Sequence, residues 1–167
     1  MKIYFYEALV YLIRFLQLIP DRIRYFCYKK IYKIPNDFRF NGARTKIYGE
    51  GQIFIGNKSY CGEGCSFQLK KNASITIGSN CAISHGVKIY TANKDPGYII
   101  SGGKRKINLA NVKIGNNVWI GANVFITEGV VIGDNVVVGA NSVVTRDLPE
   151  KTVCVGSPCK VIKSYTE

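Results

Sequence analysis

The sequence predicts an all-β protein, a parallel β-helix, preceded by a helical segment and interrupted by one projecting loop. The first observation is an aliphatic residue at every sixth position, a period that neither an α-helix nor a flat strand has. The second is the residue three positions later, mostly Asn, Gly or Asp, which tolerate positive φ. The third is a mostly small or β-branched residue one position further, which suits a narrow interior. The aliphatic positions are Ile114, Ile120, Ile126, Ile132, Val138 and Val144.

A backbone that bends once every six residues closes a triangular coil with three bends, and such coils stack into a solenoid. The same pattern appears earlier at Ile77 and Ile83, and more faintly at Ile55 and Cys61. Residues 91–112 break the period, and we expect them to form a loop outside the coils. Without this loop, residues 47 to 144 make about four coils, more than the roughly three repeats that such a stack needs.

One domain is enough to explain the chain. Its segments are a basic, aromatic N-terminal helical segment (1–46), the β-helix (47–163) and a tail (164–167). Residues 1–48 hold ten Lys or Arg and three Asp or Glu, a net +7 of the chain's +12. The apolar run from Leu9 to Ile19 is too short and too charged for a membrane span, and no cleavage site follows it. We expect this segment to pack as a helix on the end or flank of the β-helix.

An alternative for the N-terminal segment is peripheral contact with an anionic membrane surface, because aromatic residues are interleaved with its cations. Nucleic acid is not an expected partner, because charge alone supports only non-specific contact and no recognised binding motif accompanies it. The expected location is cytoplasmic, with the inner face of the membrane as the alternative position.

The cysteines follow the register of the coils. Cys61 stands at an aliphatic position, whereas Cys65 and Cys81 stand at the small inward position. Buried Cys behaves as a small hydrophobe. No CxxC pair is present, and the spacings match no zinc module. We therefore predict structural thiols in a reducing, cytoplasmic setting, and no metal site.

Three segments resemble the left-handed β-helix hexapeptide-repeat acyltransferases. They are ISHGVKIYT (83–91), VKIGNNVWIGANVFITEGVVIG (112–133) and residues 132–163, which end in DLPEKTVCVGSPCKVIK. The most similar branch contains galactoside and maltose O-acetyltransferases and those of bacterial surface polysaccharides. The resemblance covers most of residues 47–163. It implies a left-handed coil and a homotrimer, with acetyl-CoA in a groove between neighbouring β-helices.

The resemblance also assigns residues to acetyl-CoA. Ala122 and Ala140 match the corners where the family's pantetheine arm passes, and both are small enough to let it approach. Thr145 and Arg146 match the segment that meets the adenine nucleotide. Lys160 and Lys163 match basic positions near the CoA phosphates, where cations suit a ligand with several negative charges.

The catalytic base is the point at which this chain departs from the branch. Galactoside and maltose enzymes place a His directly after the IYT-like strand, and here that position is Lys94. Transfer to a hydroxyl needs a group that removes the proton during attack, a role that suits His. The one His of the chain, His85, falls at an outward corner of the coil that leads into the loop. We predict that His85 is the base, and that Lys94, Asp95 and Trp119 contact the acceptor.

The predicted reaction is transfer of acetyl from acetyl-CoA to a sugar hydroxyl, in a surface polysaccharide or its precursor. Two alternatives remain open at this point. One is N-acetylation of an amino sugar or another small amine, and the other is a trimeric scaffold that has kept the fold and lost the chemistry. The zinc carbonic anhydrases built on the same β-helix are set aside, because their metal needs three His and this chain has one.

Overall fold

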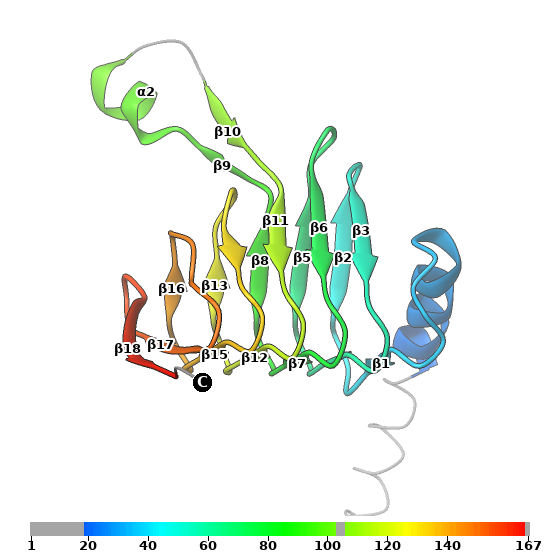
Figure 1. The fold of residues 1–167 in the computed structure, drawn as a ribbon. Helices are drawn as coiled ribbons and strands as arrows, with labels where there is room; N and C mark the ends of the chain where they lie inside the picture. Colours follow the sequence, from blue (N-terminus) through cyan, green and yellow to red (C-terminus); the bar gives the residue numbers. More distant parts are fainter. Residues whose placement is uncertain (1–18, 103–105, 166–167) are drawn as a thin grey trace, which may run out of the picture.

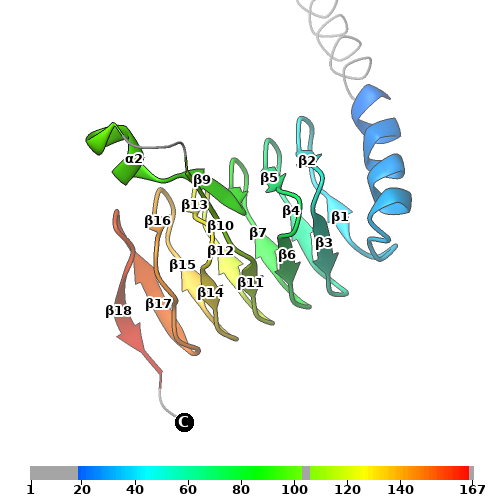
Figure 2. The same ribbon diagram turned by 90° about the horizontal axis from the view of Figure 1, so that it is seen from above.

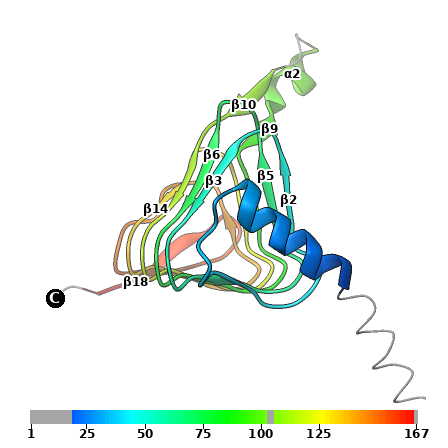
Figure 3. The same ribbon diagram turned by 90° about the vertical axis from the view of Figure 1, so that its right-hand side faces the viewer.

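The computed structural model describes residues 19–102 and 106–165, which form a parallel β-helix of five coils with a helix across one end (Figure 1). Seen along its axis, the β-helix is a triangular tube whose three sides are parallel sheets (Figure 3). The predicted fold class is confirmed. The apolar run that begins at Leu9 lies almost wholly outside the described residues.

Each of the first four coils contributes one strand to each sheet. The first sheet contains β1 (Arg39–Phe40), β4 (Tyr60–Cys61), β7 (Ala82–Ile83), β12 (Trp119–Ile120), β15 (Val137–Val138), β17 (Thr152–Val155) and β18 (Lys160–Ser164). The second contains β2 (Lys46–Gly49), β5 (Ser66–Leu69), β8 (Lys88–Tyr90), β13 (Phe125–Ile126) and β16 (Val143–Val144). The third contains β3 (Gln52–Ile55), β6 (Ser74–Ile77), β11 (Val112–Ile114) and β14 (Val131–Ile132).

The sheets meet at three edges of the tube. We call the edge between the first and second sheets the first corner, the edge between the second and third sheets the loop corner, and the remaining edge the third corner. At the loop corner the chain leaves the third coil as β9 (Ala92–Lys94) and returns as the antiparallel β10 (Ile107–Leu109). The short helix α2 (Pro96–Ser101) lies in this excursion, which leans along the axis toward the C-terminal coils (Figures 1 and 2).

The core consists of inward side chains stacked from coil to coil. Ile83, Ile120 and Val138 are neighbours on adjacent strands and are each no more than 1% exposed. Each coil surrounds its inward side chains with three short strands, so the backbone must bend tightly after each strand. Asn at these bends adopts the left-handed conformation, with φ of 57° at Asn123 and 58° at Asn141. The predicted inward positions are therefore confirmed, and so are the turn positions occupied by Asn and Gly, whereas Asp147 at the last one does not adopt a positive φ.

The first coil starts before the expected boundary at residue 47. Strand β1 already pairs with β4 in the parallel register of the first sheet, so the stack has five coils rather than about four. The β1 side of this coil lacks the aliphatic-Gly-x-Asn pattern, and aromatic residues pack there, whereas Ile47 and Ile53 supply the interior on the β2 and β3 sides. Phe38 is 1% exposed and its ring lies edge-on to that of Phe40, with 5.0 Å between centroids. A periodicity of aliphatic residues could not detect the β1 side of this coil.

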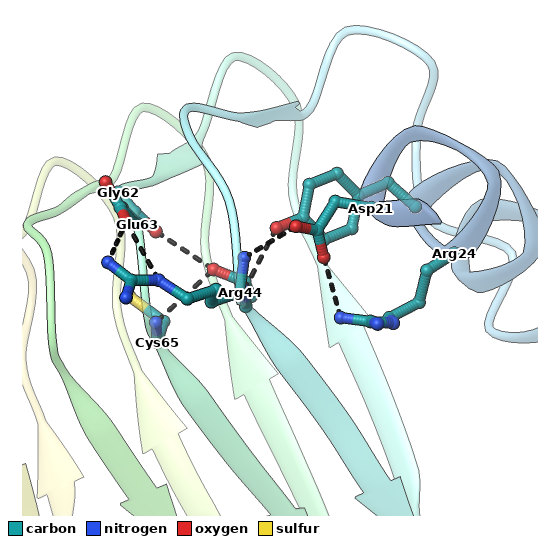
Figure 4. Close-up of polar contacts among 8 residues, drawn as sticks. Asp21, Arg24, Arg44, Gly62, Glu63 and Cys65 are labelled. Carbon is teal, nitrogen blue, oxygen red and sulfur yellow. Dashed lines mark hydrogen bonds and ion pairs between the residues drawn. The ribbon is translucent and has the colours of Figure 1, made fainter. Parts of the chain in front are cut away.

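The helical residues 19–31 lie across the open end of the first coil (Figure 3). The Tyr25 ring stacks on Phe40 with centroids 4.4 Å apart, and its hydroxyl accepts a hydrogen bond from the Thr45 backbone N–H at 3.0 Å. The buried Asp21 carboxylate accepts from Arg24 at 2.6 Å and from the Arg44 backbone N–H at 3.1 Å (Figure 4). The helix therefore closes the end of the core. Within the described part of the chain, no helix is long and apolar enough to cross a membrane.

The cysteines occupy the inward positions predicted for them. Cys61, Cys65 and Cys81 are at most 1% exposed, and all six cysteines are free. The Cys81 thiol donates to the Gly115 carbonyl at 3.1 Å. The neighbouring Cys65 thiol and burial raise the pKa of Cys61 well above its usual value. These thiols pack as small core side chains.

We expect Ile120→Ala to lower the free energy of unfolding by about 2–5 kcal/mol, because it leaves a cavity between stacked coils. Urea denaturation measures the change. Ile99→Ala, at a side chain that is 60% exposed on α2, serves as the control and should stay within about 0.5 kcal/mol of the parent. Equal effects of the two substitutions would contradict the packed interior described here.

Candidate active site

One column of residues at the first corner contains the predicted base and two predicted acetyl-CoA residues. Ile83, Ile120 and Val138 are in register, so His85, Ala122 and Ala140, each two positions later, occupy equivalent places in successive coils. The backbone ladder confirms this alignment: Asn123 N–H donates to the His85 carbonyl at 2.9 Å, and Asn141 N–H donates to the Ala122 carbonyl at 2.8 Å. Neighbouring members are thus separated by roughly 4.8 Å, the spacing of adjacent strands.

The His85 side chain is exposed, as is Ala140, and Ala122 is half-buried. In the coil before His85 the equivalent place belongs to Glu63, whose backbone carbonyl accepts from the Gly86 N–H at 2.8 Å. The Glu63 carboxylate is held by Arg44 (Figure 4). The column therefore runs from a neutralised carboxylate, through the imidazole, to two small side chains that leave its surface open.

Trp119 belongs to the same region. It lies on β12 beside Ala82, with its side chain 55% exposed on the outer face of the first sheet. Its Nε1–H donates to the Ser84 hydroxyl at 3.4 Å, and Ser84 directly precedes His85. The indole thus lies next to the column rather than in the core.

The C-terminal hairpin brings one predicted lysine to the far end of the column. Lys160 begins β18 and pairs with Val155, the last residue of β17. The Cys159 N–H donates to the Val143 carbonyl at 2.8 Å, which ties this segment to the start of β16. Lys163 lies further along β18, opposite Val153, with its ammonium 4.6 Å from the centre of the Tyr165 ring. Both lysines are exposed.

The remaining predicted residues lie at a different edge. Thr145 and Arg146 follow β16 at the loop corner, where both are exposed. Lys94 and Asp95 lie at the base of the excursion, beyond the same corner. Strand β8 separates His85 from this excursion, so within one chain the two lie at different corners. One side of the triangle, about 10 Å of extended chain, lies between them.

Asp95 has its carboxylate engaged within the loop. One oxygen accepts from the Gly97 N–H at 2.7 Å and caps α2, and the other lies 3.3 Å from the Lys106 ammonium. Asn93 donates from its side chain to the Glu128 carboxylate in the next coil, which fixes the root of the excursion. Asp95 and Asn93 therefore hold the loop in place, whereas Lys94 is exposed between them.

A shallow pocket at the loop corner is lined by Gln68, Lys70, Ala92, Asn93, Lys94 and Ile107. Among the described residues, the Gln68 Oε1 is a buried side-chain oxygen without a hydrogen-bond partner. Gln68 lies between Tyr48 and Tyr90 on the outer face of the second sheet. Burial and a hydrogen bond with Tyr90 raise the pKa of Tyr48 to about 12. Lys70 and Lys94 line this pocket with two cations, whereas the Gln68 oxygen itself is buried.

The described residues contain no group of three or more His, Cys, Asp or Glu that could hold a metal ion.

Known proteins resemble the chain in sequence and in structure. Residues 111–146 match the family model "Bacterial transferase hexapeptide (six repeats)". A maltose O-acetyltransferase structure from Clostridium difficile 630 is 32% identical, with 83% of this chain and 75% of that chain covered and a TM-score of 0.56. The chain belongs to the hexapeptide-repeat acetyltransferases.

Two further relatives of the chain extend the comparison. A hexapeptide-repeat acetyltransferase from Vibrio cholerae O1 biovar eltor, solved with acetyl coenzyme A, is 27% identical, with 87% of this chain and 78% of that chain covered and a TM-score of 0.68. The Saccharomyces cerevisiae protein YJL218W, named as an acetyltransferase, is 43% identical over 123 residues. That match covers 72% of this chain but 59% of the yeast protein, so the chain spans less than two thirds of this relative.

Sequence reasoning did not single out three residues that lie at these two corners. Ser84 contacts Trp119, Glu63 begins the column, and Gln68 carries the unpartnered oxygen. The alignment of coils could have placed Glu63 and Ser84, since both stand at fixed offsets from Cys61 and Ile83. Nothing in the sequence distinguishes Gln68, because its unmet hydrogen bond depends on what surrounds it.

We expect Gln68→Met to raise the free energy of unfolding by about 1 kcal/mol, because an unpartnered buried oxygen costs about 1–3 kcal/mol. Gln52→Met, at an exposed position on β3, is the control and should change it by less than about 0.5 kcal/mol. Urea denaturation of both variants checks the prediction. A loss of stability at Gln68→Met would mean that this oxygen is satisfied in the protein.

Proposed function

We propose that the protein is a cytoplasmic, acetyl-CoA-dependent O-acetyltransferase that acts on a sugar hydroxyl, in a surface polysaccharide or its precursor. The observation that carries the proposal is the column at the first corner. It aligns the one His of the chain with the two small residues that the family resemblance assigns to the pantetheine arm. The Vibrio cholerae relative, solved with acetyl coenzyme A, supports this donor.

In the proposed reaction His85 accepts the proton of the acceptor hydroxyl while its oxygen attacks the thioester carbonyl. The carbon–sulfur bond then breaks, and the CoA sulfur leaves and takes up a proton. Ala122 and Ala140 leave room for the donor arm along the column. Lys160, at the far end, supplies positive charge for the CoA phosphates, with Lys163 further along the same strand.

The proposal includes a homotrimer, and the separation of the two corners supports it. Within one chain, the column and the residues Thr145, Arg146 and Lys94 lie on different edges of the tube. A groove between two parallel tubes would set the loop corner of one chain against the first corner of its neighbour. Thr145 and Arg146 would then face the nucleotide end of CoA, as the resemblance implies.

The acceptor is proposed to bind at the loop-corner pocket and against Trp119. Sugar oxygens accept hydrogen bonds, which Lys70 and Lys94 at the lining of this pocket can donate. Lys94 would position the acceptor rather than take its proton. Asp95 would act indirectly, through the shape of the loop that it caps.

Acetyl-CoA is expected to raise the melting temperature by roughly 5–10 °C when present at about 100 times its Kd. Ala140→Leu should abolish the shift, because it fills the exposed column while leaving the unliganded melting temperature unchanged. Asn57→Leu, which adds bulk at an exposed position of the third corner, should keep it. No shift in the parent protein would favour the scaffold without chemistry.

We expect His85→Ala to lower turnover by about 10²–10⁴-fold, the usual contribution of general base catalysis. The acetyl-CoA melting shift should remain, which separates loss of chemistry from loss of binding. Hydroxyl and amino sugars are assayed side by side, with Lys94→Ala as the matched variant. A large loss at Lys94→Ala with normal turnover at His85→Ala would overturn the assignment of the base, and acetylation of amino sugars alone would establish the N-acetyltransferase.

A further inference from the structure

The N-terminal helix has two apolar faces, and the protein uses one of them. Asp21, Tyr25, Tyr28 and Tyr32 recur three and four residues apart and point toward the first coil, where they contact Phe40 and the chain near Thr45. A helix on the surface of a globular protein normally carries polar residues on the opposite side. Here that side carries Ile19, Ile23 and Phe26, which are 41%, 61% and 63% exposed.

Cations border this outer stripe. Arg22 and Lys30 are exposed, and the Lys30 ammonium lies 5.7 Å from the centre of the Phe26 ring. Lys33 is exposed just beyond the helix. Among the described residues 19–33 the single carboxylate is Asp21, and it is buried against the first coil with Arg24 and the Arg44 N–H (Figure 4). The outer face is therefore both apolar and positively charged.

The outer stripe has no role in closing the core. The inner face already makes the stacking and hydrogen-bond contacts that hold the helix on the first coil. Leaving Ile23 and Phe26 in water is unfavourable, because burial of apolar side chains away from water lowers the free energy. A row of large apolar side chains among cations matches the pattern of helices that lie in the interface of an anionic bilayer.

We propose that this outer face, Ile19, Ile23 and Phe26 with Arg22 and Lys30, docks on an anionic lipid surface. Cations would contact the lipid phosphates while the apolar side chains enter the interface. The eighteen preceding residues add Lys2 and Arg14 against Glu7, among many Leu, Ile and aromatic residues, so the sequence does not reverse the charge or the apolar character.

The position of the helix determines how the rest of the protein would stand on the bilayer. The helix lies across the end of the tube (Figure 3). A bilayer bound to the outer face of the helix would therefore lie beyond that end. The column runs from Glu63 in the second coil toward the C-terminal coils. The excursion leaves the third coil and leans in the same direction (Figure 1). Docking therefore leaves the first corner and the loop corner accessible. Access to a lipid-linked acceptor rests on the proposed function, whereas docking itself does not.

The test is co-sedimentation of the full chain with vesicles of phosphatidylcholine alone and with added phosphatidylglycerol, at low and high salt. Binding is expected only to the anionic vesicles, and salt should weaken it. Arg22→Gln should weaken binding about fivefold, and Phe26→Ser about tenfold. Ile162→Ser on β18, whose side chain is also 63% exposed, is the matched control and should bind as the parent does.

Equal binding to both vesicle types, no binding, or the same loss in Ile162→Ser and Phe26→Ser would each overturn the proposal. The competing hypothesis is that a second copy of the chain covers this face, and light scattering without lipid tests it. Self-association that Phe26→Ser abolishes, together with no vesicle binding, would assign the face to that second copy. Each variant is also melted with and without acetyl-CoA. Retained melting behaviour shows that the fold is intact, and it separates failure of docking from failure of the acetyltransferase assignment.

Discussion

The parallel register of the coils is the constraint on which the rest of the structure depends. Each inward aliphatic packs on its equivalent in the coil before, and each corner must bend tightly enough to bring the next strand under its neighbour. Asn in the left-handed conformation at Asn123 and Asn141 makes that bend, and their side chains then hydrogen-bond to each other at 3.3 Å. A one-residue shift would turn the aliphatic side chains outward, so the register is strongly defined.

The register also decides what the surface presents. Residues at the same offset from an inward aliphatic form a column along an edge, whatever their separation in sequence. His85 and Ala122 are adjacent in space because the whole excursion is inserted between β8 and β11 without disturbing the pairing of β7 with β12. The same geometry keeps Lys94 at another edge. A function that needs both edges therefore points to a second chain, as the proposed trimer supplies.

The N-terminal helix shows how one element can serve the core and the surface separately. Its tyrosines and Asp21 close the open end of the first coil, which would otherwise expose Phe38 and Phe40 to water. Closing the core uses only the inner face of the helix. The residues of the outer face are therefore free to serve another role. The basic composition of the segment is consistent with packing and with a lipid surface together, because the two uses involve opposite faces.

The sequence by itself determined the β-helix, the inward positions and the turn residues, because they follow a short repeat with a fixed period. The excursion is the segment where that period breaks, and the family follows from motifs within and after the repeats. It also placed His85 at an outward corner, since register gives direction. Only the tertiary structure showed the first coil at Arg39, the separation of His85 from the loop and the unpartnered Gln68 oxygen. These depend on which edge a residue reaches and on what surrounds it there. A period of six specifies the path of one coil, whereas contacts between edges and across the end of the tube arise only when the coils are stacked.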